Sequence, residues 1–581
     1  MTNEALTERA APPRDAPGRH SSGSEALVRM LQAAGVDTVF GLCGDTSLPF
    51  YEALHDLDHG IRHVLTRDER GAAYMADAYA RLSGRVGVCE GPSGGGASYI
   101  LPGVAEANAS SVPVIAMTSD IDARHRGKNV LTEFDQAALF APVTREAFYP
   151  THASMLPGVV RRAFRAVTTG RMGAVHITLP FNVLEGAVET DDLGIDPRYG
   201  TYPAHRVGPD PDAIRAAARI LGEARRPLIV ASAGVQRSGA WDEVTRLAHR
   251  LGAPVATSIG GKGSIAETDP YSLGVIGSNG GIAYRHDIVR SADVVVYIGS
   301  GTGSVTTLKW TLPQSGEATV IQLDVDPEEI GRNYPVAVGI VADAKFGLAA
   351  LEAELVHAYG DADLVKVDAT EIEQGRTAYM DKVEHLFASD ETPIRPERLL
   401  REMFRAMPGD SVVLADPGTP CPYFSAYWRI PKAGRWFVSP RAHGALGYAL
   451  PAVVGAYYAK PDAGRIIGVM GDGSFGISTG DLETIARLNI PVTLVVTNNA
   501  SYGWIKAGQK SRGGRYYSVD FSRTDNAAVA AAFGLRSHRV DEPAALADAL
   551  HDALTYPGPV LLDVRTQPLE EAYAPVSKWI A

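Results

Sequence analysis

Amphipathic segments and short apolar runs alternate along most of the chain. The stretch SEALVRMLQAAG (24–35) places apolar residues at helical spacing, and the apolar run VDTVFGLCG (36–44) follows it. The same order returns in DERGAAYMADAYARLSG (68–84) and VGVCE (86–90). Apolar residues three and four positions apart predict a helix, whereas short apolar runs predict a buried strand. Because strands that alternate with helices favour parallel pairing, the pattern predicts an α/β fold with mainly parallel sheets.

This alternation divides into three units. The first, predicted over 23–190, ends soon after the apolar run VHITLP (175–180), and the stretch rich in Asp, Gly, Pro and Tyr that follows is typical of a linker. The second, over 206–355, contains four strand-like runs and looks like a Rossmann-type domain. The third is predicted over 390–570 and shares with the first an order of strand, glycine-rich turn and helix. We therefore expect three doubly wound domains, two of which have a similar layout.

Length, composition and charge are those of an α/β enzyme. The chain has 581 residues, enough for three or four domains at about 150 residues each. It is 45% hydrophobic and contains 60 glycines, which is typical of a soluble protein of this class. The formal net charge is −12 with the two signs interspersed, so we expect no basic surface for nucleic acid or anionic lipid.

The N-terminal residues and the cysteines indicate the cellular compartment of the protein. Residues 1–22 are polar and lack the apolar core of a signal peptide, so we expect a disordered tail there. No run of about 18 apolar residues follows, and no membrane span is expected. Cys43, Cys89 and Cys421 are scattered, which disfavours a zinc site or a disulfide framework. Together these features predict a protein of the reducing cytoplasm.

Candidate chemistry is concentrated in GDGSFGISTGDLETIARLNIPVTLVVTNN (471–499). Gly471 and Gly473 let the backbone turn sharply and approach a phosphate, and Asp472 follows a predicted buried strand. One crossover helix and one strand later, Asn498 and Asn499 reach the same sheet edge, where ligands of open α/β sheets bind. Carboxylate, carboxamide, carbonyl and phosphate oxygens suit Mg²⁺ that bridges to a diphosphate. A Gly-Asp-Gly turn alone is equally well explained as structure, and the paired asparagines favour the metal site.

Gly471-Asp472-Gly473, 24 intervening residues and Asn498-Asn499 resemble the thiamine diphosphate motif of the enzymes that include acetolactate synthase, pyruvate decarboxylase, benzoylformate decarboxylase and oxalyl-CoA decarboxylase. The resemblance extends over about residues 24–570 and is closest to the acetolactate synthase branch. It implies Mg²⁺ ligands at Asp472, Asn499 and the carbonyl of Ser501. The two glycines and Ser474 are then expected beside the cofactor.

The same resemblance assigns an acid to Glu69. In the family, a glutamate of the first domain contacts the aminopyrimidine ring of the cofactor and drives it to the imino form, which removes the thiazolium proton. A carboxylate in a first helical turn is common for structural reasons because it favours the helix dipole. The sequence RGAAYMADAYARLSG after Glu69 is close to the family's helix and favours the catalytic interpretation. Burial among apolar groups should raise the pKa of such a carboxyl.

Further residues of the cofactor domain match by position. Leu446, in HGALGYALPA, falls at the apolar position that props thiamine diphosphate into its bent form, with Gly444 beside it, although a core leucine is the simpler explanation. Gly418 and Thr419 would approach the diphosphate or the pyrimidine, but turn chemistry also explains this glycine. His443 would face the reacting carbon and relay protons there.

Gln136, in LTEFDQAALFAPVTREA, aligns with an active-site glutamine of the acetolactate synthase branch. It would hydrogen-bond a substrate carbonyl or carboxylate, and the alternative is a glutamine on a surface loop. Lys506 and Arg512 follow the asparagines and would either meet an anionic acceptor or form a solvated helix face.

The chain also departs from the family pattern. The turn GPSGGG belongs to a segment about three residues longer than in acetolactate synthase, and Tyr149 stands where that branch has a lysine. In the middle unit, YIGSGTGSVTTLKW replaces the arginine-containing run that helps to hold FAD. Relatives hold FAD, ADP or nothing there, and these alternatives stay open.

The resemblance implies an enzyme that depends on thiamine diphosphate and Mg²⁺, cleaves or decarboxylates a 2-oxo acid or related ketone, and transfers the carbanion to an acceptor. The alternatives are a simple 2-oxo acid decarboxylase, a flavin-linked oxidase of the pyruvate oxidase type, or a non-catalytic paralogue. In this architecture the active site forms between the first domain of one chain and the third domain of another. A homodimer is then the minimum unit, and a homotetramer is common.

Overall fold

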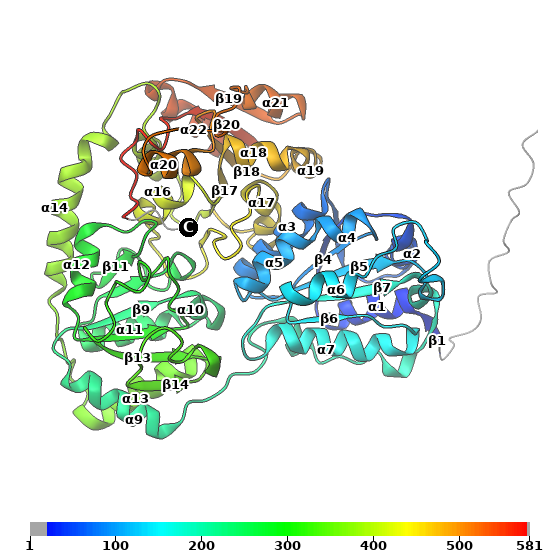
Figure 1. Ribbon diagram of the computed structural model, residues 1–581, viewed down its shortest axis with the longest axis horizontal. Coiled ribbons are helices and arrows are strands. Elements are labelled where there is room, and N and C mark those ends of the chain that lie inside the picture. The colour runs from blue at the N-terminus through cyan, green and yellow to red at the C-terminus, as the bar shows by residue number, and fades with distance from the viewer. Residues whose placement is uncertain (1–19, 578–581) are drawn as a thin grey trace, which may run out of the picture.

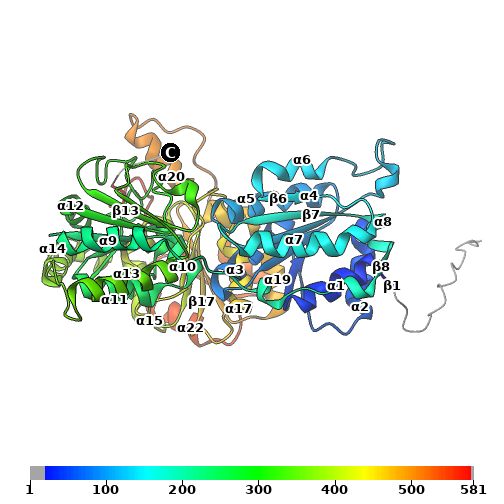
Figure 2. The same ribbon diagram turned by 90° about the horizontal axis from the view of Figure 1, so that it is seen from below.

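The structure is a computed structural model that describes residues 20–577. Most of the predicted N-terminal tail, residues 1–19, lies outside the described residues. The last residues of that tail form the short strand β1 (His20–Ser22), which pairs antiparallel with β8 (Ala187–Glu189). Three six-stranded sheets follow along the chain, and helices cover both faces of each (Figures 1 and 2). The predicted α/β class with three parallel sheets is therefore confirmed.

The first sheet has the strand order β3-β2-β4-β5-β7-β6, and all its ladders are parallel. Its strands are β2 (Thr38–Gly41), β3 (Arg62–Leu65), β4 (Gly87–Gly91), β5 (Val114–Asp120), β6 (Glu146–Phe148) and β7 (Ala174–Pro180). The helices of this part are α1 (Gly23–Ala33), α2 (Leu48–Asp56), α3 (Glu69–Ser83), α4 (Gly95–Tyr99), α5 (Leu101–Ala109), α6 (Gln136–Phe140), α7 (Leu156–Thr168) and α8 (Phe181–Glu185).

The middle sheet has the order β11-β10-β9-β12-β13-β14, which in chain order is the arrangement of a dinucleotide-binding fold. Its strands are β9 (Pro227–Ala231), β10 (Val255–Thr257), β11 (Ser272–Val275), β12 (Val294–Ile298), β13 (Thr319–Asp324) and β14 (Val338–Val341). Its helices are α9 (Pro211–Glu223), α10 (Ala233–Ser238), α11 (Trp241–Leu251), α12 (Ala283–Ser291) and α13 (Ala344–Tyr359). The helix α14 (Ala369–Phe387) then runs along the outer side to the third unit (Figure 1).

The third sheet has the order β16-β15-β17-β18-β20-β19 and is parallel throughout. Its strands are β15 (Val412–Ala415), β16 (Phe437–Val438), β17 (Ile466–Gly471), β18 (Val492–Asn498), β19 (Arg536–Val540) and β20 (Val560–Arg565). Its helices are α15 (Pro396–Ala406), α16 (Pro420–Tyr427), α17 (Ala449–Ala459), α18 (Asp472–Ser478), α19 (Leu482–Leu488), α20 (Gly503–Ser511), α21 (Asn526–Ala532) and α22 (Leu546–Thr555). When the strands are numbered in chain order within each sheet, the first and third sheets have the same strand order. These two units therefore share one topology.

Helices α3 and α17 join the first and third units within the chain (Figure 1). Both helices are rich in alanine, and their buried residues belong to one apolar core that spans the two units. The approach is so close that a Cβ at Gly455 would lie 2.0 Å from the carbonyl oxygen of Met75. Small residues on both helices therefore allow a contact that a larger side chain would prevent.

Candidate active site

The Gly-Asp-Gly motif forms a junction between a strand and a helix. Strand β17 ends at Gly471, and α18 begins at once with Asp472. The crossover helix thus starts earlier than the sequence predicted, and a short 3₁₀ turn (Thr479–Asp481) separates α18 from α19. Strands β15 and β17 are neighbours in the sheet, and the chain continues from β15 to β16 on one side and from β17 to β18 on the other. This junction therefore lies at the topological switch point, where α/β sheets bind ligands.

The Asp472 carboxylate ties the ends of β17 and β18 together. Its Oδ2 accepts hydrogen bonds from the backbone N–H groups of Asn499 (3.1 Å) and Ala500 (2.6 Å). Its Oδ1 accepts from the backbone N–H of Gly473 (2.9 Å). Burial raises the pKa of Asp472 to about 6, although these three N–H groups favour the ionised form. A bound cation would therefore favour the charged state of this carboxyl.

The donor set around Asp472 fits a hard divalent cation. Asn499 Oδ1 accepts from the backbone N–H and the hydroxyl of Ser501, each at 3.2 Å, and the Ser501 carbonyl accepts from Gly503 N–H (2.9 Å). Within residues 20–577 no group of three or more His, Cys, Asp or Glu side chains could hold a metal. A carboxylate with amide and carbonyl oxygens is a set that Mg²⁺ accepts when phosphate oxygens complete its shell.

Glycines around this junction have two different roles. A Cβ at Gly471 or Gly444 would meet nothing within 4 Å, so the backbone there faces open space that a phosphate would fill. A Cβ at Gly473 would instead lie 2.8 Å from the ring of Tyr502, so this glycine makes room for an aromatic side chain. Gly418 has a φ of +99°, a conformation that favours glycine.

Ser474 supports the loop before α17. Its hydroxyl accepts from Gly447 N–H (2.7 Å) and donates to the carboxylate of Asp416, so it is already engaged within the protein. Asp416 also accepts from Ala449 N–H (2.6 Å), and burial raises its pKa to about 6. Sequence reasoning missed Asp416, although a carboxylate directly after the strand SVVLA at a sheet edge was a usable signal.

The loop after β15 meets the loop that carries Leu446. A Cβ at Gly418 would lie 4.0 Å from Leu446 Cδ2, and a Cβ at Gly503 would lie 3.0 Å from the hydroxyl oxygen of Thr419. Leu446 is half-buried in this chain rather than a core residue. The structure thus brings Gly418, Thr419 and Leu446 together at the carboxyl edge of the third sheet.

Glu69 begins α3 at the carboxyl edge of the first sheet. Its neighbours are glycines of the segment after β4: a Cβ at Gly91 would lie 3.2 Å from Glu69 Cγ, and one at Gly96 would lie 2.9 Å from Glu69 Oε1. Glu69 is 7% exposed. Burial raises its pKa, and the charges of Asp68 and Glu90 raise it further. The glycines of GPSGGG thus make room for a buried carboxyl whose pKa is raised.

The start of α3 also contacts the third unit. Asp481 Oδ1 accepts from Arg67 N–H (3.0 Å), and a Cβ at Gly71 would lie 2.1 Å from Asp481 Oδ2. No hydrogen bond or ion pair of the described residues joins Glu69 to Asp472, however. The predicted acid and the predicted metal site are therefore not joined by a direct polar contact, although other residues of the first and third units are.

Gln136 is buried at the first residue of α6 and does not lie on a surface loop. Its Oε1 accepts from the Thr118 hydroxyl (2.5 Å), and its Nε2 donates to the carbonyl of Ser119 (2.9 Å). The Thr118 hydroxyl also lies 2.6 Å from His176 Nε2, and the His176 ring stacks on Phe140 at 3.7 Å. This packing fixes the carboxamide at the end of β5.

His443 is exposed in this chain, and its backbone is held by the first unit. Glu106 of α5 accepts from the backbone N–H groups of His443 (2.8 Å) and Gly444 (3.2 Å). This carboxylate is buried, and it pairs with Arg81 (3.1 Å) and accepts from Ser110 Oγ (2.6 Å). Glu106 therefore positions the loop that leads to Leu446, which sequence reasoning did not anticipate.

Lys506 is engaged in ion pairs with Asp520 (2.7 Å) and Glu570 (3.0 Å), so its charge is already balanced. Arg512 is exposed at the end of α20. Tyr149 accepts a hydrogen bond from Arg126 Nε at 3.0 Å. Of the two alternatives for Lys506, the structure thus disfavours a free cation for an anionic acceptor.

A cavity of about 400 Å³ lies at the carboxyl edge of the middle sheet, the place where a nucleotide would bind in this fold. The lining arginines are largely engaged elsewhere. Arg237 donates to the carbonyls of Ser110 and Ser111, and Arg171 pairs with Glu329 at 2.9 Å. Arg441, which also lines this cavity, has a buried Nε without a hydrogen-bond partner among the described residues, so the lining does not decide whether a nucleotide binds there.

Comparisons with known proteins agree with this geometry. Three family models match in order: the N-terminal TPP binding domain of thiamine pyrophosphate enzymes at residues 21–139, the central domain at 214–352, and the C-terminal TPP binding domain at 416–564. Thiamine pyrophosphate (TPP) is another name for thiamine diphosphate. The chain belongs to the thiamine pyrophosphate enzyme family.

Similarity to curated relatives indicates the branch of this family. A probable acetolactate synthase large subunit of Methanococcus aeolicus is 33% identical over 568 residues, which cover 94% of this chain and 92% of the relative. An acetolactate synthase of Mycobacterium bovis is 31% identical over 536 residues, 91% of this chain and 82% of the relative. A probable 2-ketoarginine decarboxylase, AruI, of Pseudomonas aeruginosa is 32% identical over 497 residues, 84% of each protein. The chain is thus an acetolactate synthase-like member that depends on thiamine diphosphate and acts on C–C bonds. In residues 20–577, no helix is long and apolar enough to cross a membrane.

Proposed function

We propose that the protein uses thiamine diphosphate and Mg²⁺ to decarboxylate or cleave a 2-oxo acid or related ketone and to transfer the resulting carbanion to an acceptor. One observation carries this proposal: the buried Asp472 carboxylate joins the ends of β17 and β18 at the switch point and has no cationic partner among the described residues. When bound, thiamine diphosphate supplies the electron sink for C–C cleavage.

We assign the cofactor and metal contacts to the third domain. Asp472, Asn499 and the Ser501 carbonyl would hold Mg²⁺, and the open backbone at Gly471 and Gly444 would face the diphosphate. Gly418, Thr419 and Leu446 lie together beside that edge and would shape the cavity for the rings. Ser474 and Gly473 would support the site without contacting the cofactor. Ser474 would do so through its hydrogen bond to Asp416, and Gly473 by leaving room for the ring of Tyr502.

We assign proton handling to Glu69. Burial raises its pKa above the ordinary glutamate value, which would help the carboxyl to exchange a proton with a ring nitrogen. Gln136 would orient a substrate oxygen through one free lone pair or amide hydrogen, and His443 would exchange protons from its exposed imidazole.

We infer that the working enzyme is at least a homodimer and expect a homotetramer. The resemblance to the family implies a site formed between the first domain of one chain and the third domain of another, and no hydrogen bond or ion pair of the described residues joins Glu69 to Asp472 within one chain. Sedimentation velocity in the presence of cofactor tests this inference, since a monomer with full activity would contradict it. We also propose a reducing cytoplasm, because all three cysteines are free and Cys89 and Cys421 are buried.

The direct test is CO₂ release from a panel of 2-oxo acids by the protein with thiamine diphosphate and Mg²⁺. Turnover that disappears with Glu69→Gln supports the proposal. A protein that binds thiamine diphosphate but turns over no 2-oxo acid or 2-hydroxy ketone of a broad panel would contradict the assigned reaction.

Simple decarboxylation is the second candidate, because one relative carries a decarboxylase name. Product analysis separates the two reactions: a coupled 2-hydroxy-2-methyl-3-oxo acid or hydroxyketone indicates transfer, whereas only an aldehyde indicates decarboxylation. A flavin-linked oxidase would show flavin absorbance and oxygen uptake, and we expect neither.

A further inference from the structure

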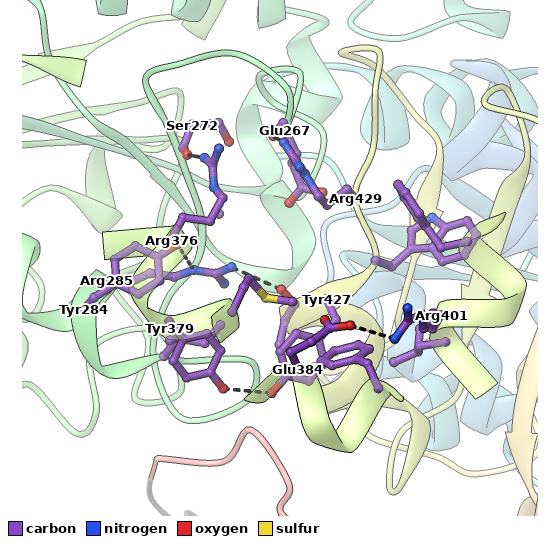
Figure 3. A pocket seen from close by; sticks show the side chains of 18 of the residues that line it. Glu267, Ser272, Tyr284, Arg285, Arg376, Tyr379, Glu384, Arg401, Tyr427 and Arg429 are labelled. Atoms are coloured by element: carbon purple, nitrogen blue, oxygen red, sulfur yellow. Dashed lines mark hydrogen bonds and ion pairs between the residues drawn. The ribbon is translucent and has the colours of Figure 1, made fainter. Parts of the chain in front are cut away.

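Another cavity, of about 330 Å³, lies between the middle domain, α14 and the helices α15 and α16, and Figure 3 shows its side chains. Its lining includes no residue of the candidate active site and none of the cavity at the edge of the middle sheet. The volume is at the lower end of the range of about 300–1,000 Å³ for small-molecule sites. This cavity is therefore large enough for one small organic ligand.

Aromatic rings form much of the wall. Tyr379 and Tyr427 come from α14 and α16, and their hydroxyl groups are hydrogen-bonded at 2.8 Å. The ring of Tyr284 lies 6.2 Å from that of Tyr379. At the rim, Phe404 packs edge-on against Trp428 at 5.9 Å, yet Phe404 remains 51% exposed. These rings offer flat apolar surfaces on which a planar body can pack.

Positive charge gathers on the same wall. Five arginines line the cavity, from α12, α14, α15 and the segment after α16: Arg285, Arg376, Arg401, Arg405 and Arg429. The carboxylates nearby already have cationic partners. Glu267 pairs with the buried Lys262 at 2.6 Å, Glu384 pairs with Arg401 at 2.7 Å, and Glu373, next to the cavity on α14, pairs with Arg376 at 2.6 Å. The lining as a whole thus has more cations than carboxylates to balance them.

Arg285 and Arg429 carry the excess charge. Arg285 is buried and donates to the backbone carbonyls of Val275, Gly280 and Ala426. Its Nε also donates to the hydroxyl of the neighbouring residue Tyr284 at 3.4 Å. Arg429 is exposed and makes one hydrogen bond, from Nη2 to the carbonyl of Glu267 (2.9 Å). Over residues 20–577, no carboxylate lies within ion-pair distance of either guanidinium.

Arg429 also lies close enough to Arg376 to feel its charge. The part of the side chain that is shielded from solvent lowers the pKa of Arg429, and the positive charge of Arg376 lowers it further, whereas the charges of Glu267 and Glu373 raise it. In Figure 3 these two arginines stand on one side of the cavity, opposite Tyr379 and Tyr427. An anion between the two guanidinium groups would accept hydrogen bonds from the free donors of Arg429 and would share Arg376 with its ion-pair partner Glu373.

We propose that this cavity is a binding site for a small organic anion with a planar aromatic body, separate from the active site. Its anionic group pairs with Arg429 and Arg376, and its ring packs against Tyr379, Tyr427 and the rim residue Phe404. The site is built by residues of the middle domain, α14 and the third domain, so the ligand contacts all three parts at once. The proposal does not depend on the proposed reaction.

The test uses 2-naphthoate as the anionic probe and 2-naphthalenemethanol as its neutral match, titrated by calorimetry into protein saturated with thiamine diphosphate and Mg²⁺. We expect one saturable 2-naphthoate site per chain and binding of the neutral probe at least about tenfold weaker. Arg429→Gln should weaken 2-naphthoate at least about tenfold, and Phe404→Ser should weaken both probes severalfold. Both residues are exposed, so these variants should remain folded.

Arg219→Gln is the matched control, because Arg219 is exposed on α9 of the middle domain and has no ion pair among the described residues. It should bind 2-naphthoate as the unmodified protein does. The proposal is overturned if 2-naphthoate does not bind, if the neutral probe binds as tightly, or if Arg429→Gln binds like Arg219→Gln. Because the cofactor site is filled throughout, loss of catalysis alone would not produce any of these results.

Discussion

Glu106 should control cofactor affinity although it would not touch the cofactor. Its carboxylate accepts the backbone N–H groups of His443 and Gly444 at 2.8 and 3.2 Å, and so fixes the loop that leads to Leu446. Hydrogen bonds to a charged group contribute about 1.5–3 kcal/mol each. Glutamine keeps one acceptor oxygen and loses the charge, so Glu106→Gln removes about one such bond.

In the variant, cofactor binding must order the loop that leads to Leu446 without that hydrogen bond. The lost free energy corresponds to an affinity for thiamine diphosphate about 10- to 100-fold weaker. Calorimetric titration of thiamine diphosphate at saturating Mg²⁺ measures this change, with circular dichroism to establish that the variant is folded. Glu52→Gln is the control, since Glu52 is exposed on α2 and has no ion pair in the described part of the chain. A folded Glu106→Gln protein that binds the cofactor within about threefold of the Glu52→Gln protein would refute the positioning role.

Three further predictions follow from other parts of the molecule. Glu69→Gln should lower turnover about 100-fold or more while the melting temperature changes little, and full activity would remove Glu69 from the mechanism. Gly455→Ala should destabilise the fold by about 1–3 kcal/mol in urea unfolding, because the new Cβ would lie 2.0 Å from the Met75 carbonyl, whereas Gly158→Ala on α7 meets nothing within 4 Å; equal effects would contradict the packing. Burial raises the pKa of Glu397 from 4.5 to about 7, so its ionisation opposes folding: this contribution is absent below about pH 4.5 and grows as pH rises to about 7. Glu397→Gln should therefore gain about 2–3 kcal/mol relative to the unmodified protein between pH 5 and pH 8, and a pH-independent difference would disprove the shift.

The proximity of Asp472 and Asn499 could be predicted from the sequence, because it follows from the common direction of parallel strands. In a parallel sheet, neighbouring strands end at one edge, and this places Asp472 near Asn499 once RIIGVM and PVTLVVT are recognised as strands. Glu69 was predicted as the acid from its motif, and of that prediction the structure bears out only the rise in pKa that burial causes. The strands β11 and β14 were missed, since each is only four residues long and contains a glycine.

Contacts between distant segments were not accessible in the same way. Glu106 acts on a loop 337 residues away, and no local pattern links the two. The hydroxyl of Ser474 reaches Asp416 and Gly447 rather than open space, which depends on how three loops pack. Likewise, Gly473 is required by the ring of Tyr502, a side chain that follows 29 positions later in the sequence. These residues gain their roles from tertiary packing alone.

The central claim is that the edge formed by β17 and β18 holds thiamine diphosphate through a divalent cation. The measurement that tests it most directly is calorimetric titration of thiamine diphosphate into the protein with Mg²⁺ and with EDTA, repeated for Asp472→Ala. We predict saturable binding with Mg²⁺ that is lost with EDTA and in the variant. Binding that is equally tight without the metal or without the Asp472 carboxylate would contradict the account.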